Sequence, residues 1–378
     1  MRLKTEEFME QMKRFWQKYH KYMSDSILDL SKKLISIEST LGNTEELNRA
    51  LDVVLCEMRG LKIEKFNNKG VQSVLIYSSK TRPQKFKVIL NGHLDVVPGK
   101  NFQFKPKIIK GRLYGSGAAD MKANLACFIK VFKEVVNKVS YPLGLQIVTD
   151  EELGGFKGTK FQIEKGVRAD FVISGESTSL NIVSKTKGVL RVRISCAGKT
   201  SHGAYVWNGI NAISQMSMFI TRLNNSHPNP DREKWITTIN VATIETNNKA
   251  FNKIPEYCEI VLDIRYIPED KKKIIDDVRK LLTKDMKFEV IIDEPPLSNN
   301  DKNYYIQQLR KTCKSILGKE VKLYGAHGTS DARHFTNTNS TGIEFGAGGA
   351  NIGCDNEYMD IKTLEKYEEI LKKFLLSL

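Results

Sequence analysis

Short apolar runs alternate with amphipathic stretches along most of the chain, and several of these runs end directly before polar residues. The run Val88–Leu90 predicts a buried strand that turns outward at an Asn-Gly pair, and Leu145–Val148 and Phe171–Ile173 predict two more strands. Residues Met121–Phe128 have the periodicity of an amphipathic helix. Strands that alternate with helices indicate an α/β fold, in which helices flank a mixed, mostly parallel sheet.

A change of pattern after residue 183 indicates an inserted domain. Residues Ser184–Asp293 read as strand, helix, strand, strand, helix, strand, which is an α+β pattern. The pair Pro295-Pro296 marks the return of the chain. We therefore predict a discontinuous catalytic domain at residues 1–183 and 296–378 and an inserted domain at residues 184–295, for which 378 residues are sufficient.

Histidine and acidic side chains follow the ends of the predicted strands and one Gly-rich stretch. They are His93, Asp95, Asp120, Glu151, Glu152 and Glu176. Strand ends of open α/β sheets are where sites form. Taken singly, each side chain would be an ordinary solvated acid or a structural histidine. Together they predict a metal site, because clustered carboxylates repel one another without a cation, and imidazole with carboxylate oxygen suits zinc.

The chain resembles a known family in the segments VILNGHLDVVPG, LYGSGAADMKA, IVTDEELGG and VISGEST. This is the family of di-zinc aminoacylases, deacetylases and exopeptidases that includes acetylornithine deacetylase and succinyl-diaminopimelate desuccinylase. The resemblance runs from roughly Asp25 to the C-terminus. It implies a zinc-exopeptidase-like catalytic domain with an inserted ferredoxin-like lid that also forms a homodimer. It further implies two zinc ions per chain, or cobalt in their place.

The resemblance gives the clustered residues separate roles. His93 and Glu176 would bind the first zinc, Asp120 would bridge the two ions, and Glu152 would bind the second. Asp95 would orient the imidazole of His93.

The catalytic and substrate-binding residues also follow from the resemblance. Glu151 would be the general base toward a zinc-activated water, and His202 would stabilise the oxyanion in the active site of a neighbouring subunit. Taken without the family, His202 would be structural or solvated, and Arg265 would form an ordinary ion pair on a strand. The residues that would hold the substrate are Asn252, Arg265, Gly328 and Thr329.

The chain departs from the family near its C-terminus. The family completes its second zinc site with a histidine in a pattern such as H-x-x-x-E. Counting back from Glu357 places Gly353 at that position, and no histidine follows His334. The adjacent Cys354 could supply a thiolate ligand, or it could be a small, partly buried thiol. A solvent-filled ligand position and a lost ligand are the other interpretations.

Composition adds limits on partners and location. The formal net charge of +15 arises from 59 Lys and Arg against 44 Asp and Glu. These basic residues are scattered, so we expect no nucleic-acid partner, although a positive field would attract anionic substrates. Six cysteines without paired spacing predict reduced thiols in a cytoplasmic protein, and no apolar run suits a membrane span. The spacing of Phe8, Met12 and Phe15 predicts an N-terminal amphipathic helix.

The sequence therefore favours a metal-dependent hydrolase that cleaves the amide bond of an N-acylated amino acid, as a deacetylase or desuccinylase does. A dipeptidase or tripeptidase is an alternative within the same chemistry. A non-catalytic protein that binds an amino-acid-like ligand is the third hypothesis, and it depends on Gly353.

Overall fold

The computed structural model describes residues 26–378, so the predicted N-terminal helix lies outside the described part. The chain divides into two units. The first unit contains the chain up to Ser184 together with Asn299–Tyr324 and Ser330–Leu378. The second contains Lys185–Ser298 and Gly325–Thr329, so the short segment 325–329 belongs with the inserted region rather than with the catalytic one.

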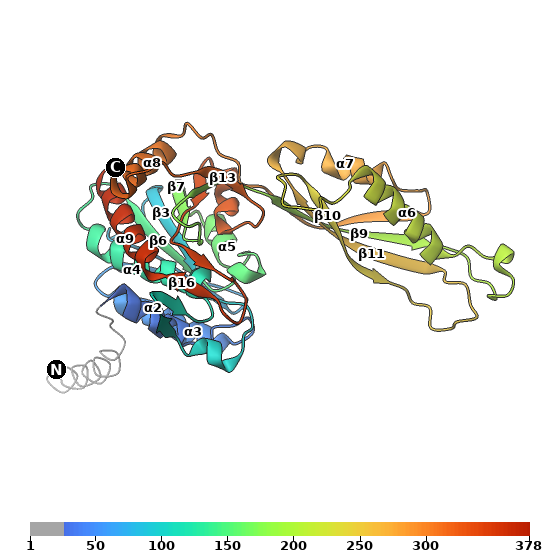
Figure 1. The fold of residues 1–378 in the computed structure, drawn as a ribbon, viewed down its shortest axis with the longest axis horizontal. Helices are drawn as coiled ribbons and strands as arrows, with labels where there is room; N and C mark the ends of the chain where they lie inside the picture. Colours follow the sequence, from blue (N-terminus) through green and yellow to red (C-terminus); the bar gives the residue numbers. More distant parts are fainter. Residues whose placement is uncertain (1–25) are drawn as a thin grey trace. The chain divides into compact units, whose positions relative to one another are not determined.

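An eight-stranded mixed sheet forms the centre of the first unit (Figure 1). Its strands, in spatial order, are β1 (Lys62–Asn68), β2 (Val71–Tyr77), β6 (Leu143–Val148), β3 (Phe86–His93), β7 (Ala169–Ser174), β14 (Thr341–Glu344), β8 (Ile182–Thr186) and β13 (Leu323–Ala326). The four central strands β6, β3, β7 and β14 are parallel to one another. Every residue of β6 is buried, which explains its continuous apolar run.

Helices cover both faces of this sheet. One set packs in the main hydrophobic core: α2 (Ile27–Ile35), α3 (Thr44–Glu57), α4 (Ala123–Val135), α8 (Tyr304–Leu317) and α9 (Ile361–Leu376). On the other face, a smaller core joins the sheet to α5 (Thr159–Glu164) and the 3₁₀ helix η6 (Asp331–Thr338). The side chains of Asn303 and Asp360 cap the N-termini of α8 and α9 by accepting backbone N–H groups. The predicted fold class is confirmed.

A small four-stranded sheet completes the first unit. Its strands, in spatial order, are β15 (Gly349–Ala350), β16 (Tyr358–Asp360), β5 (Arg112–Tyr114) and β4 (Lys107–Ile109). The pairing of β16 with β5 brings the end of the C-terminal loop against the segment that leads into Asp120.

The second unit has the order strand, helix, strand, strand, helix, strand that the sequence predicted. Its elements are β9 (Gly188–Ala197), α6 (Ala212–Ser226), β10 (Thr238–Glu245), β11 (Tyr257–Tyr266), α7 (Ile274–Arg279) and β12 (Met286–Glu294). The antiparallel sheet order β10-β11-β9-β12 is ferredoxin-like (Figure 1). On α6, Met216 and Phe219 are buried in the core of this unit. Ile210 and Ile213, which share their helical spacing, are exposed instead.

Two further features bear on the expectations from composition. All six cysteines are free, and only Cys354 among them is exposed. Among the described residues, no helix has the length and apolar character needed to cross a membrane.

Candidate metal centre

His93 is the last residue of β3 and lies at the centre of the candidate site. Its side chain is almost fully buried, with Nδ1 2.9 Å from the carbonyl oxygen of Asp95. Its Nε2 lies 3.0 Å from Oδ1 of Asp120 and 4.0 Å from Oε1 of Glu176. The parallel neighbours of β3 are β6 and β7, so the residues that follow these strands meet at the same edge of the sheet.

Asp95 lies behind His93 and contacts two predicted ligands at once. Its side chain is fully buried, and its Oδ1 is 3.6 Å from His93 Nδ1. Its Oδ2 accepts the backbone N–H of Glu152 at 2.9 Å. Oδ1 has no hydrogen-bond partner among the described residues, which fits a carboxylate that serves the imidazole beside it.

Three side chains have the spacing of metal ligands. One ligand atom each from His93, Asp120 and Glu152 lies within 4.8 Å of the others. Zinc binds nitrogen and oxygen at about 2.0–2.2 Å, so two ligands of one ion are at most about 4.4 Å apart. The spacing of these three donors is therefore close to that of groups that share a zinc site. The nitrogen and oxygen donors present therefore fit zinc.

Burial and crowding perturb the protonation of these groups. Burial raises the pKa of Glu151 and of Glu176 well above the ordinary value, with nearby carboxylates adding to the effect. Burial likewise raises the pKa of Glu152 to about 7. Burial opposes the charged form of His93, but the hydrogen bond to Asp120 and the nearby Asp95 carboxylate outweigh it and raise the imidazole pKa. Carboxylates that hold protons in this way are suited to exchanging them for a cation.

Two more charged groups near the site were not predicted from the sequence. Burial raises the pKa of Glu344, the last residue of β14, to about 7, and the charge of Asp120 contributes to this shift. Ile343 is the only large apolar residue directly before Glu344, so the apolar-run signal that identified His93 is absent there. Lys122 is fully buried, and its Nζ donates to the carbonyl of Ile37 at 2.9 Å.

The segment Asp331–His334 supports the turn that carries Glu151 and Glu152. Arg333 Nη2 donates to the carbonyl oxygen of Gly154 at 2.7 Å, and His334 Nε2 lies 2.8 Å from the same oxygen. Asp331 Oδ2 accepts the hydroxyl of Thr159 at 2.5 Å. The side chain of His334 therefore contacts the backbone of the turn that carries the two glutamates.

In the second unit, the structure brings His202 and Asn252 together. The exposed His202 pairs with Lys253 through an isolated β-bridge, and the carbonyl of Asn252 accepts the N–H of Gly203 at 2.6 Å. His202 Nδ1 accepts the N–H of Ala204 at 3.1 Å. The loop around His202 is thus held to the loop of Asn252.

Arg265 lies on β11 and forms two hydrogen bonds with the Asp263 carboxylate, at 3.0 and 3.1 Å. This is the strand ion pair that the sequence left as an alternative. The hydroxyl oxygen of Thr329 is 3.0 Å from that of Thr186, and the neighbouring Gly328 is exposed.

The C-terminal loop places Gly353 in the left-handed region, with φ of 70°. A Cβ there would meet only Val97 Cγ2, at 3.6 Å, so space allows a side chain but the backbone disfavours one. Cys354 is exposed, and it is not part of the three-residue group around His93. Its role as a metal ligand stays a prediction.

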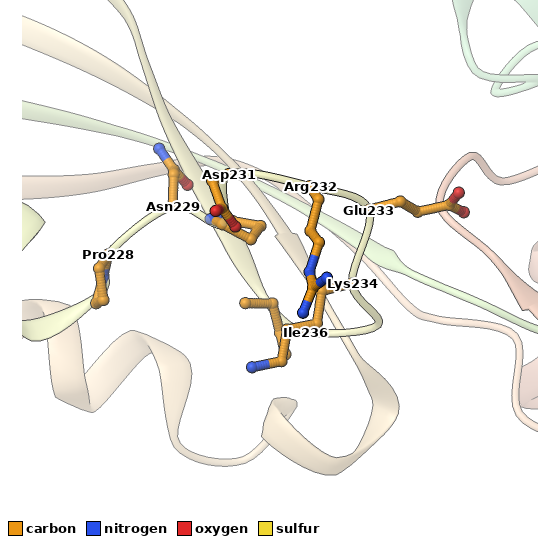
Figure 2. A pocket seen from close by; sticks show the side chains of 8 residues that line it. Pro228, Asn229, Asp231, Arg232, Glu233, Lys234 and Ile236 are labelled. Carbon is orange, nitrogen blue, oxygen red and sulfur yellow. The ribbon is translucent and has the colours of Figure 1, made fainter.

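A pocket of about 760 Å³ lies in the second unit, and none of the predicted site residues is among those that line it. Figure 2 shows the loop Pro228–Ile236 that lines it, with Glu233 extending away from Arg232 and Lys234. Glu233 Oε1 is 3.3 Å from Nε2 of His327, so His327 belongs to a contact within this unit.

A metal-dependent hydrolase is the class of protein that this fold and its clustered histidine and carboxylates define. The chain belongs to peptidase family M20/M25/M40, whose model matches residues 89–377. The family resemblance and the prediction of an enzyme are thereby confirmed.

Curated relatives agree with this assignment. Succinyl-diaminopimelate desuccinylase from Buchnera aphidicola subsp. Cinara cedri is 31% identical over 388 residues, covering 93% of this chain and 99% of the relative. The protein of the same name from Wigglesworthia glossinidia brevipalpis is 28% identical over 385 residues, covering 93% of this chain and 100% of the relative.

Solved structures show the same fold. Aminopeptidase PepT from Bacillus cereus has a TM-score of 0.76 at 18% identity, covering 93% of this chain and 97% of that one. An M20 family metallo-carboxypeptidase from Sulfolobus solfataricus has a TM-score of 0.75 at 18% identity, covering 93% of this chain and 99% of that one.

Proposed function

We propose that this chain hydrolyses the amide bond of an N-acylated amino acid, in the manner of a deacetylase or desuccinylase. One observation carries the proposal: ligand atoms of His93, Asp120 and Glu152 lie within 4.8 Å of one another. Glu151 directly precedes Glu152 in the chain. The 31% identity to a succinyl-diaminopimelate desuccinylase supports the choice of substrate class.

In this proposal, His93, Asp120, Glu152 and Glu176 hold zinc, with two ions per chain. Zinc bound there would lower the pKa of water to about 7 and polarise the scissile carbonyl. The buried Asp95 keeps the His93 ring in place, which favours one orientation of its Nε2. Cys354 remains the proposed protein ligand for the second ion, with solvent as the alternative.

Glu151 is the proposed general base. Its pKa is raised, mainly by burial, so its carboxylate can take a proton from the attacking water and pass it to the leaving nitrogen. The turn that holds it is fixed by Arg333 and His334 through the carbonyl oxygen of Gly154.

His202 is the proposed oxyanion donor, acting in the active site of a second copy of the chain. Apolar side chains are exposed near it, which supports contact with another subunit through this unit. They are Tyr205, Val206, Trp207, Ile210 and Ile213. The proposed contacts to the substrate are Arg265, Asn252, Gly328 and Thr329. The carboxylate of the substrate would compete with Asp263 for the Arg265 guanidinium.

One other function has specific support. A dipeptidase or tripeptidase is favoured by the solved structures, which include a tripeptidase from Staphylococcus aureus with a TM-score of 0.76. A non-catalytic binding protein, the hypothesis that depends on Gly353, is disfavoured because the family model that matches the chain is that of a peptidase family. The free cysteines fit a reducing compartment, and a cytoplasmic location is part of the proposal.

The proposal is tested by removing metal, adding zinc back, and assaying N-succinyl and N-acetyl amino acids beside dipeptides and tripeptides. Hydrolysis of an N-acyl amino acid only in the zinc-treated sample is the expected result. Faster cleavage of the peptides would favour the peptidase alternative. Zinc binding without any turnover would favour the non-catalytic one.

A further inference from the structure

Glu357 forms a buried cap over the loop that carries Asp120. Its Oε1 accepts the N–H of Ala119 at 2.8 Å and the N–H of Asp120 at 3.1 Å. Its Oε2 accepts the N–H of Gly117 at 3.2 Å, and its side chain is only 3% exposed. The carbonyl oxygen of Glu357 also accepts the N–H of Gly115 at 3.2 Å.

These backbone groups have no regular secondary structure to bond with. Asp120 and Met121 have non-helical backbone angles, so the segment before α4 does not continue the helix. Buried N–H groups without an acceptor destabilise the fold because they lose their bonds to water. An ionised carboxylate is acceptor-only and can take all three, whereas a glutamine amide would set a donor against one of them.

The position of Asp120 controls the metal centre because its Oδ1 is the group beside His93 Nε2, at 3.0 Å. A site of this kind needs its ligands fixed by supporting hydrogen bonds. We propose that Glu357 is a positioning residue that sets the backbone of Asp120 for metal binding; this rests on the proposed metal site.

The same contacts give the C-terminal loop a second way to act on the metal centre, apart from any ligand at Gly353 or Cys354. The N–H of Glu357 donates to the carbonyl oxygen of Cys354 at 3.1 Å, and Gln103 Nε2 donates to that oxygen at the same distance. The C-terminal loop is therefore hydrogen-bonded to the Asp120 segment through Glu357, at the end of the loop. Loss of the family's histidine leaves this connection intact.

The test compares the zinc dissociation constant of the full-length protein with those of E357Q, E357D and E57Q, using competition with a chromophoric chelator. Glu57, the last residue of α3, is a matched control because it is also buried, pairs with Lys130 of α4 at 2.8 Å, and is not among the predicted site residues. We expect E357Q and E357D to bind zinc about 10- to 100-fold more weakly, and E57Q to bind as the wild type does even if it melts earlier.

Melting curves of the metal-free proteins identify variants that fold. E357D keeps the charge but shortens its reach, so it remains informative if E357Q does not fold. The positioning role is overturned if the wild type binds zinc tightly and folded E357Q and E357D bind it equally well. The proposed function would still stand in that case. Failure of the wild type to bind zinc would defeat both.

Discussion

The buried carboxylate of Asp95 accepts the backbone N–H of Glu152 at 2.9 Å, while its other oxygen lies 3.6 Å from the imidazole of His93. The side chain of Asp95 thus links two predicted ligands, His93 at the end of β3 and Glu152 after the end of β6. Strands β3 and β6 are parallel, so this contact fixes the spacing between the histidine and the glutamate turn. Asp95 needs no contact with the metal to influence its binding.

Replacing Asp95 with asparagine should weaken zinc binding. The amide keeps the size of the side chain but places a donor next to either the His93 ring or the Glu152 N–H. We expect the zinc affinity to fall by about 10- to 100-fold. Competitive chelation measures it, and zinc binding equal to wild type would show that Asp95 does not support the ligands.

His202 should act across the dimer. We expect H202A to lose about 10²-fold in kcat with a smaller change in KM, since an oxyanion donor acts mainly in the transition state. Mixing H202A with E151Q after dissociation should restore activity. Random exchange would give about a quarter of wild-type turnover, because one site in four combines both intact residues. Mixtures that stay inactive, although exchange is demonstrated, would contradict a role in the neighbouring subunit.

Arg265 should govern substrate binding more than chemistry. R265A is expected to raise KM for an N-acyl amino acid by about 10-fold or more with a smaller effect on kcat, because a charged hydrogen-bonded pair is lost in both states. R191A is the matched control, since Arg191 also neighbours Asp263, at 3.9 Å, but is not a predicted contact. Equal KM values for the two variants would identify Arg265 as a structural ion pair.

The metal-free protein should lose stability as the pH rises from about 4.5 to about 7. Burial raises the pKa of Glu152 from its ordinary 4.5 to about 7 and that of Asp150 from 3.8 to about 6. A carboxyl with a raised pKa binds its proton more tightly in the folded state, so the folded state is favoured at low pH. Its advantage declines as the pH approaches the folded pKa.

Zinc should reverse part of this loss, because it replaces the protons held by the carboxylates. Melting temperatures of metal-free and zinc-loaded protein across this pH range provide the measurement. We expect the difference between them to be larger at pH 7 than at pH 5. A metal-free protein whose melting temperature rises steadily over the same range would contradict the burial of these carboxylates.

Strand ends were predictable from local sequence because a buried strand needs a continuous apolar run and ends where polar residues begin. This is why His93, Glu151 and Glu152 could be placed at one edge of the sheet. Glu357 could not be recognised as a cap, because its partners lie about 240 residues earlier in the chain. Such a contact depends on the pairing of β16 with β5 and leaves no local pattern.

The sequence also could not predict that Ile210 and Ile213 are exposed, and here the reason differs from that for Glu357. Helical spacing identifies an apolar face but not what covers it, and the sheet of the second unit covers only part of this helix and the loop before it. Cys354 illustrates a third limit, since a ligand position on a loop depends on backbone geometry. Its role as a metal ligand is still a prediction.

The most direct test of the account compares zinc-loaded wild type with zinc-loaded E151Q, measuring zinc per chain and turnover of an N-acyl amino acid on the same samples. Because Glu151 is the proposed base and not a ligand, E151Q should hold as much zinc as the wild type and lose about 10²- to 10⁴-fold in kcat. Turnover by E151Q at the wild-type rate, or a wild type that is inert with its zinc bound, would contradict the account.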